Sequence, residues 1–313
     1  MFSRRQMLCG LAVTAGSSIS IGGYAVAEPY SLIVRTYRPA PARWPDGLEL
    51  RLALLTDFHA CDPWMSVERI ASIVERTNAL KPDAVLLLGD YVAGHKMLRF
   101  ARNIAERDWA RALAGLKAPF GVHAVLGNHD WWDDQQAQLL RRGPPAAQRA
   151  LEAAGIPVYE NRATRLVKDG KPFWIAGLGD QSSFAPRAWA PGVTPGPKGW
   201  EGTHDLPGTM RGVSDDAPVV LMAHEPDIFE QVPDRVALTV CGHTHGGQVR
   251  IPGMKPYVPS VYGDRFIYGH IIERGRHLIV SSGLGCSSAP VRFGVPPEIV
   301  IVELGRWSAV AQS

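Results

Sequence analysis

The stretch Val236–Val249, VALTVCGHTHGGQV, constrains the fold of this chain more than any other. An apolar, β-branched run stops at Gly-His-Thr-His and two glycines, which is typical of a buried strand that opens into a tight loop. Side chains alternate along an extended backbone, so His243 and His245 start on the same side. Because neutral imidazole is the commonest metal ligand among side chains, the pair indicates a candidate metal site. A solvated loop is the alternative, and the rest of the chain has to distinguish the two.

Residues 1–27 have the pattern of an export signal. Arg4 and Arg5 precede a weakly apolar segment, Leu8–Ala25, and the sequence Ala-Val-Ala at 25–27 supplies an A-x-A cleavage site. The paired arginines predict export by the twin-arginine machinery, which carries folded proteins to the periplasm or cell envelope. An uncleaved anchor, with peripheral membrane or cell-envelope association, is the alternative. The serines and glycines of the segment make it a poor spanning helix.

The composition is that of an ordinary globular protein: of 313 residues, 46% are hydrophobic and 20% are charged. The formal charge of +3 falls to +1 once Arg4 and Arg5 are removed, which gives no argument for nucleic acid as a partner. Beyond residue 27 the cysteines are Cys61, Cys241 and Cys286. An odd number does not make a disulfide framework, and one pair with a free thiol or three buried thiols both stay open.

The first half of the chain alternates between strand and helix patterns, which predicts a parallel α/β layout. In open α/β sheets, ligands bind at the carboxyl ends of the strands. The expected order is strand Leu48–Thr56, helix Ser66–Leu80, strand Ala84–Leu88, helix Ala101–Leu116, strand Val122–Leu126 and helix Gln135–Ala154 with a break at Gly143-Pro144-Pro145.

The second half predicts more strands and one long loop. Residues 178–213 are rich in Gly, Pro and Trp, and we interpret them either as a substrate-shaping lid or as a surface insertion. No linker is long enough to divide residues 28–313, so we expect one domain there. The expected strands are the hairpin Arg165–Lys168 and Phe173–Gly177, then Pro218–Met222, Ala237–Val240, Leu278–Ser281 and Ile299–Val302.

Five short polar motifs each follow a predicted strand. Alone, each is a weak signal, because an aspartate after a strand is often a helix cap and a lone histidine is often structural. Together, in the same setting, they predict a metal centre. They are Asp57-Phe58-His59, Gly89-Asp90, Gly127-Asn128-His129-Asp130, Ala223-His224-Glu225 and Gly242-His243-Thr244-His245.

This set of carboxylate, amide and imidazole groups is too large for one cation and suits two that share a ligand. Mixed nitrogen and oxygen donors exclude Ca²⁺ and disfavour Mg²⁺, and they suit Mn, Fe, Co, Ni or Zn. Asp90 is the natural bridging carboxylate, and Asn128 offers a neutral oxygen. Two cations roughly 3.5–4 Å apart clamp the attacking and leaving oxygens of a phosphoryl displacement, and a water between them is ionised near neutral pH.

In their order, these motifs resemble those of the calcineurin-like metallophosphoesterases. The likeness spans residues 57–245, and the flanking strands extend it to nearly the whole chain after residue 27. It implies a four-layer α/β fold, in which a two-sheet β-sandwich is flanked by helices, and a dinuclear centre. It also implies that His129 binds the phosphate and protonates the leaving oxygen while Asp130 orients its ring. The implied ligands are Asp57, His59, Asp90 and His245 for the first metal, and Asp90, Asn128, His224 and His243 for the second.

Two longer strings, Gly242–Gln248 and Arg292–Glu298, resemble a bacterial subgroup of exported or membrane-associated phosphodiesterases. The subgroup is similar to enzymes that cleave the pyrophosphate of a UDP-linked diacylated glucosamine. We therefore expect hydrolysis of a small-molecule or lipid-linked phosphoester, more readily a diester, by a hydroxide bridging the metals. A pyrophosphatase acting on such a lipid precursor is one alternative. A non-catalytic metal-binding scaffold is another, which the presence of His129 and every ligand disfavours.

The identity of the two divalent cations is less constrained by the sequence. Zn²⁺ outcompetes Mn²⁺ at most nitrogen and oxygen sites, but folding before export lets the cell set which metal enters. We expect Mn²⁺ on this basis, with Zn²⁺ or Fe as alternatives. Three further residues are weaker candidates: His95 as a substrate contact or surface residue, Arg292 as a phosphate or salt-link partner, and Asp180 as a turn residue.

Overall fold

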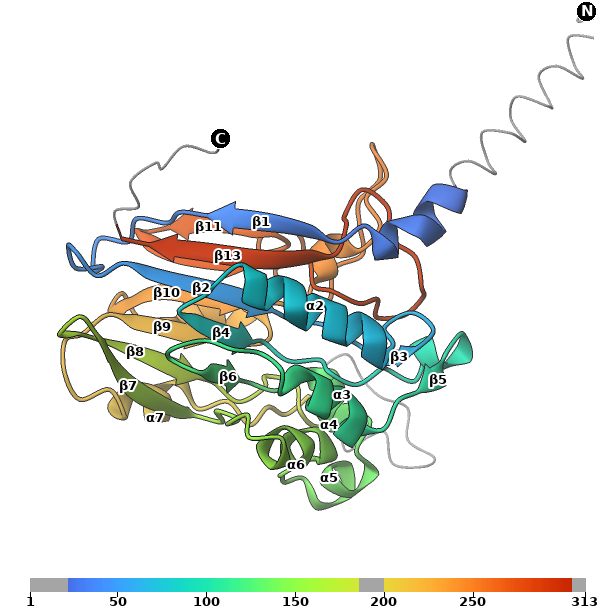
Figure 1. The fold of residues 1–313 in the computed structure, drawn as a ribbon, viewed down its shortest axis with the longest axis horizontal. Helices are drawn as coiled ribbons and strands as arrows, with labels where there is room; N and C mark the ends of the chain where they lie inside the picture. The colour runs from blue at the N-terminus through green and yellow to red at the C-terminus, as the bar shows by residue number, and fades with distance from the viewer. Residues whose placement is uncertain (1–21, 186–199, 306–313) are drawn as a thin grey trace, which may run out of the picture.

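Strand β2 (Leu50–Leu55) is buried on both faces, which explains its nearly continuous apolar sequence. Leu52 and Leu54 pack into the core between two sheets, whereas Ala53 and Leu55 pack against helices on the outside. Successive side chains of a strand point to opposite faces, so one strand contributes to two cores. The computed structural model describes residues 22–185 and 200–305 (Figure 1).

Two sheets pack face to face through the core that contains Leu52 and Leu54. The five-stranded sheet has the order β1 (Ile33–Tyr37), β13 (Glu298–Leu304), β2, β4 (Ala84–Leu87) and β6 (Val122–Ala124). The six-stranded sheet has the order β11 (Gly269–Glu273), β12 (Arg276–Val280), β10 (Val236–Cys241), β9 (Val219–Met222), β8 (Lys171–Gly177) and β7 (Arg162–Lys168). A separate ribbon pairs β3 (Cys61–Asp62) with β5 (Arg102–Asn103).

Helices cover the outer faces of both sheets (Figure 1). The five-stranded sheet carries α2 (Val67–Ala79), α3 (Glu106–Leu113) and α6 (Ala146–Ala153). The six-stranded sheet carries α7 (Leu206–Arg211) and the 3₁₀ helix η4 (Pro226–Gln231). The predicted two-sheet sandwich with flanking helices is confirmed. The shorter elements are η1 (Glu28–Tyr30), η2 (Met97–Arg99), α4 (Asn128–Trp132), α5 (Gln135–Leu140) and η5 (His245–Gly247).

The predicted elements differ from the structure at particular points. Helix α3 begins at Glu106 instead of Ala101, because residues 102–103 pair with Cys61–Asp62. Strands β1 and β11 were not expected. The break predicted at Gly143-Pro144-Pro145 does separate α5 from α6.

Two of the predicted segments lie partly outside the described residues. Of the predicted leader, residues 22–27 are described and are helical. Of the predicted long loop, residues 186–199 are not described, and α7 occupies part of the remainder. Within the ranges 22–185 and 200–305, no helix is both long and apolar enough to cross a membrane.

Parallel pairing brings the ends of several strands to one place. Strands β2 and β4 are parallel neighbours in one sheet, and β9 and β10 are parallel neighbours in the other. Parallel strands end at the same edge, so the loops that follow them can meet.

Candidate metal centre

The five polar motifs meet at this common edge of the two sheets. Asp57 and His59 follow β2, Asp90 follows β4, and Asn128 opens the helix after β6. From the other sheet, His224 follows β9, and His243 and His245 follow β10. Metal-ligating atoms of these side chains come within 4.8 Å of one another in three groups among the described residues. The groups are Asp57, His59 and His245; His59, Asp90 and His129; and Asp90, His224 and His243.

The backbone of the site is held in a strained conformation. Five of its residues other than glycine have positive φ: Asp57 (55°), His59 (46°), Asp90 (59°), His243 (69°) and His245 (51°). Left-handed backbone at such residues costs about 1–3 kcal/mol each and persists only where the surroundings enforce it. Here the left-handed backbone turns side chains at the strand ends into a shared pocket. The geometry of the site is therefore kept at a cost in folding stability.

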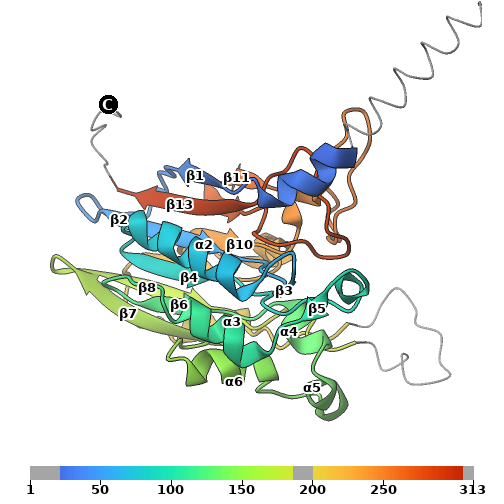
Figure 2. The same cartoon turned by 45° about the vertical axis from the view of Figure 1, so that its right-hand side comes forward.

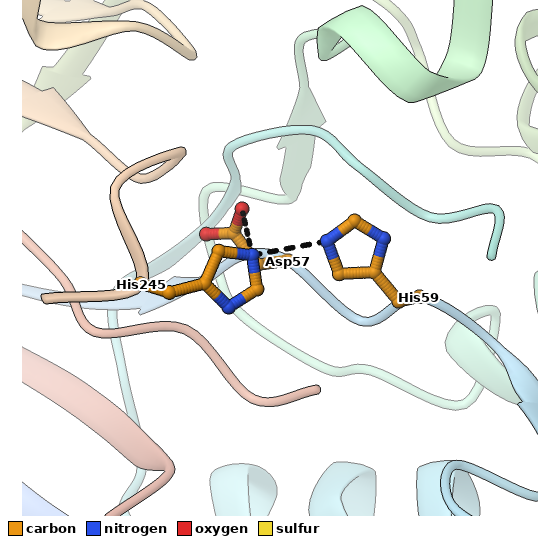
Figure 3. A group of neighbouring side chains, drawn as sticks. All are labelled: Asp57, His59 and His245. Carbon is orange, nitrogen blue, oxygen red and sulfur yellow. Dashed lines mark hydrogen bonds and ion pairs between the residues drawn. The ribbon is translucent and has the colours of Figure 1, made fainter. Parts of the chain in front are cut away.

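The first group surrounds a short gap between two imidazoles (Figure 3). His59 Nε2 lies 3.0 Å from His245 Nε2, and His245 Nε2 lies 3.4 Å from Asp57 Oδ1. Asp57 also accepts hydrogen bonds from the backbone N–H of His243 at 3.1–3.2 Å, which joins the two sheets at this point. Burial raises the pKa of Asp57 to about 6, because a buried carboxylate without a cation is poorly solvated.

The group of Asp90, His224 and His243, called the second group below, surrounds another short gap between two imidazole nitrogens. His243 Nδ1 lies 3.2 Å from His224 Nε2, and His224 Nε2 lies 3.3 Å from Asp90 Oδ2. Asp90 Oδ2 is also 3.6 Å from His59 Nε2 of the first group. Asp90 therefore stands between the two groups, in the position of a shared ligand.

The outer ring nitrogens fix which inner nitrogens can bind a cation. His224 Nδ1 lies 2.7 Å from Leu88 O, and His243 Nε2 lies 2.9 Å from Pro259 O. A carbonyl only accepts, so these outer nitrogens carry the hydrogens, and an inner nitrogen presents a lone pair when its ring is neutral. The two inner nitrogens lie 3.2 Å apart. Burial lowers the pKa of His224, but the charge of Asp90 outweighs burial and raises it well above its ordinary value, so the site favours positive charge, as a proton or a cation, beside these nitrogens. Metal-binding histidines show this pattern of an outer N–H bound to a carbonyl.

Asn128 and His59 fit a cation for separate reasons. The Asn128 side chain is buried, and its Oδ1 has no hydrogen-bond partner within the described structure. A buried amide oxygen without a donor is costly, and a cation would satisfy it. Burial lowers the pKa of His59 to about 3, so its imidazole is neutral and able to coordinate. The residues present thus fit two cations.

His129 stands beside both groups, on the first turn of α4. Its backbone N–H donates to Asp90 Oδ1 at 2.9 Å, and its ring meets the His59 ring edge-on at 5.1 Å. Gly94 lies against this ring, where an added Cβ would come within 2.4 Å of His129 Cε1, so only glycine leaves room. Burial lowers the pKa of His129, but the charge of Asp90 and the bond to Asp133 outweigh burial and raise it.

The carboxylate that contacts the His129 ring is Asp133, and the expectation that Asp130 orients the ring is corrected. His129 Nδ1 lies 3.3 Å from Asp133 Oδ2. Asp130 is the third residue of α4, and its carboxylate reaches back to the N–H of Gly127, the N-cap residue, at 2.8 Å. Asp130 also accepts from backbone N–H groups of residues 90–92, so it holds the Asp90 loop in place.

The family of the chain follows from comparison with known proteins. The family model for calcineurin-like phosphoesterases matches residues 50–247, which include every predicted site residue. The chain belongs to the calcineurin-like phosphoesterase family. As a member of it, the chain carries a dimetal-binding cluster of histidines and aspartates.

Three relatives of this phosphoesterase align with nearly all of it. The uncharacterized metallophosphoesterase YkuE of Bacillus subtilis is 28% identical, over 96% of this chain and 97% of its own. Phosphodiesterase YaeI of Escherichia coli is 29% identical, over 97% of this chain and 100% of its own. A transmembrane protein with metallophosphoesterase domain from Danio rerio is 24% identical, over 96% of this chain and 63% of its own.

Asp133 gives this phosphoesterase a first test of the site geometry. We expect Asp133→Asn to lower kcat for ester hydrolysis about 10–100-fold, the usual cost of losing a partner that orients a site histidine. Metal content should not change, because Asp133 lies in none of the three groups found in the described residues. Steady-state kinetics and metal analysis of the variant check this. Asp108→Asn, at a half-buried position on α3, serves as the control, and equal kcat for the two variants would contradict the role of Asp133.

The structure shows the surroundings of the three weaker candidates for site residues. Arg292 is fully buried, and its guanidinium donates to the carbonyls of Gly285, Ser282 and Val295. Its Nη2 also lies 3.4 Å from His245 Nδ1, so Arg292 braces the loops behind the His245 ring. Asp180 accepts from the Ser182 N–H at 2.9 Å and is the expected turn residue. His95 is exposed.

The cysteines and one tryptophan complete the surroundings of the site. Cys61, Cys241 and Cys286 are buried free thiols. Trp132, which the sequence analysis did not single out, lies with its ring 5.2 Å from the His129 ring and stacks on Trp200 at 4.4 Å. An aromatic residue three positions after a site histidine on a helix is the signal that could have found it.

Proposed function

We propose that this protein is a dinuclear metal-dependent phosphodiesterase. The observation that carries the proposal is the pair of gaps between inward-facing imidazole nitrogens, one on each side of Asp90. Two cations that share one carboxylate can stabilise both the attacking and the leaving oxygen in phosphoryl transfer.

We assign one set of ligands to each cation. The first cation takes Asp57, His59, Asp90 and His245, and the second takes Asp90, Asn128, His224 and His243. When bound, the two cations supply Lewis-acid charge to the phosphoryl oxygens and lower the pKa of the attacking water. The protein fixes the ligand rings through the carbonyls of Val92, Leu88 and Pro259.

His129 then serves as the general acid. Its ring lies 5.1 Å from the His59 ring, and a ring nitrogen comes within 4.8 Å of ligating atoms of His59 and Asp90, so it would reach a phosphoryl group held at the centre. Asp133 holds Nδ1, which leaves Nε2 to hold a proton for the leaving oxygen.

Three points of this proposal go beyond the family. The preference for diesters is supported by the E. coli relative, which is named a phosphodiesterase. Export through the twin-arginine route is supported by Arg4 and Arg5 ahead of an apolar segment. Mn²⁺ as the native cation is supported by folding before export, and metal analysis of protein purified from its native compartment tests it.

Turnover of two chromogenic esters tests the function. Protein stripped with a chelator should hydrolyse neither bis(p-nitrophenyl) phosphate nor p-nitrophenyl phosphate. Addition of Mn²⁺, Zn²⁺ or Ni²⁺ should restore turnover, with the diester cleaved faster. A faster monoester reaction would make the protein a phosphomonoesterase. Two bound cations with no activity on either ester would favour the scaffold alternative.

A further inference from the structure

Large apolar side chains are exposed on one loop beside the metal centre. This loop, residues 250–263, comes after His243 and His245, the metal-site histidines that follow β10, and is called the rim loop below. Ile251, Met254, Tyr257 and Val261 are 44%, 65%, 84% and 86% exposed. Single exposed apolar residues are normal on a soluble protein, but four such residues within eleven positions mark an interaction surface.

The rim loop is tied to the metal centre by hydrogen bonds. Pro259 O accepts from His243 Nε2 at 2.9 Å, so the loop contacts a proposed ligand directly. Asp227 of η4 holds the outer part of the loop through the Val261 N–H, at 2.9 Å, and the Ser260 hydroxyl, at 2.5 Å. The apolar side chains are therefore displayed by an anchored backbone.

The N-terminal part of the described chain adds to this surface. Tyr24 packs against Phe293 with ring centroids 5.3 Å apart, and the Arg292 N–H donates to Ala25 O at 3.0 Å. Phe293 O in turn accepts from the Arg250 N–H at 2.7 Å, which joins the N-terminal segment to the rim loop. Figures 1 and 2 both place the orange rim loop beside the blue N-terminal helix.

The segment of residues 22–30 also exposes large apolar side chains. Tyr24, Val26 and Tyr30 are each about half exposed. The undescribed residues 1–21 join the molecule at this segment, and their sequence is weakly apolar. Two segments far apart in the sequence thus present one apolar surface next to the site.

The charges of the surface favour an anionic bilayer as its partner. The rim loop contains the exposed Lys255 and the half-buried Arg250, which lies over the Tyr268 ring, and no acidic residue. The acidic neighbours are Asp264, which follows the loop, and Asp227, whose carboxylate accepts from the Ser260 hydroxyl and the Val261 N–H. Glu28, the acidic residue of segment 22–30, is buried. Aliphatic and tyrosine side chains combined with cations suit the interface of an anionic membrane.

We propose that the rim loop, together with residues 22–30 in the chain that keeps its leader, forms a membrane-docking surface that places the metal centre at the headgroups of an anionic bilayer. Docking itself is independent of the catalytic proposal. Its consequence, that the substrate is a phosphoester embedded in the bilayer, rests on the proposed function. An exported enzyme held in this way would act on lipid-linked phosphoesters without extracting them.

Co-sedimentation of the full chain with vesicles tests the proposal. The vesicles contain phosphatidylethanolamine and phosphatidylglycerol in a 3:1 ratio. We expect the variant Ile251→Ser, Met254→Ser, Tyr257→Ser and Val261→Ser to bind at least about tenfold more weakly than the wild type, since membrane binding scales with buried apolar area. The matched control is Leu139→Ser, Leu140→Ser, Val167→Ser and Ile272→Ser, which removes four exposed apolar side chains elsewhere and should bind like the wild type. Equal binding by all three proteins would overturn the proposal.

Hydrogen–deuterium exchange of the unaltered protein gives a second reading that depends on no variant. Vesicles should slow exchange in peptides from residues 22–30 and 250–263 but not in a peptide from α5. Vesicle binding without protection of the rim loop would overturn the proposal, and so would a dimer that covers the loop in the absence of vesicle binding. Neither readout uses catalysis. A protein that docks but hydrolyses no ester contradicts only the proposed function, and one that hydrolyses but does not dock contradicts only the docking surface.

Discussion

Replacing His129 by alanine is expected to lower kcat for diester hydrolysis by about 10²–10⁴-fold while both cations stay bound. The physical reason is that the leaving oxygen then departs as an anion, without a proton from Nε2. The metal content is informative, because His129 also lies within reach of His59 and Asp90 in one of the three groups. Loss of a cation in this variant would make His129 a ligand and would contradict its assignment as the acid.

The basicity of the leaving group distinguishes the acid role from simple phosphate binding. A nitrophenolate leaves readily without a proton, whereas an unsubstituted phenolate is more basic and needs one. His129→Ala should therefore lose more activity on a phenyl diester than on the p-nitrophenyl diester. An equal loss on both would show that His129 only binds the phosphate. The exposed His95→Ala is the matched control, and its turnover should equal that of the wild type.

The core and the metal-site residues could be predicted because their signals are local. The nearly continuous apolar run of β2 indicates burial on both faces, and each motif directly follows such a run. Parallel strands of one sheet end at a common edge, so strand ends predicted that Asp57, Asp90 and Asn128 would meet. His243 follows a strand of the other sheet, and it was assigned to the same centre from the set of motifs and their resemblance to a known family.

The missed features depend on contacts between distant segments. Strand β1 lies at the edge of its sheet with Arg35 and Thr36 exposed, so its sequence has no alternating apolar pattern, and it forms only because β13 pairs with it. The role of Asp133 depends on where α4 begins. A start at Asn128 puts residue 133 four positions after His129, on the same helical face, and engages Asp130 as the capping residue.

Arg292 shows the same limit within a recognised motif. Its string resembles that of the subgroup, but a surface salt link, a phosphate contact and a buried brace have the same sequence. The structural role of Arg292 becomes clear only in the folded chain, where the loop containing Gly285 closes around its guanidinium. Burying an arginine without a carboxylate partner is tolerated here because several carbonyls accept its N–H groups.

Asp90→Asn should have the largest effect on the metal centre, since the Asp90 carboxylate contacts histidines of both groups. An amide offers one neutral oxygen where the carboxylate offered two charged ones, so it cannot bridge two cations. We expect metal affinity to fall by more than the roughly 10–100-fold that loss of an outer-shell partner costs. Turnover should fall with it, and metal analysis of the purified variant should give fewer than two cations per chain.

Thermal unfolding gives a readout of the same variant that does not depend on activity. Cations bind the folded chain, so Mn²⁺ at 100 times its Kd should stabilise the wild type by about 2.7 kcal/mol and raise its Tm. Asp90→Asn should show little of this rise. Asp180→Asn is the matched control, because Asp180 is a buried carboxyl that follows β8 but belongs to none of the three groups found in the described residues. Burial and the charge of Glu225 raise the pKa of Asp180 well above its ordinary value, which favours the neutral carboxyl that an amide resembles in shape. If Asp90→Asn bound two cations and showed the same Tm rise as the wild type, Asp90 would not be a shared ligand. The main observation behind the phosphodiesterase proposal would then be contradicted.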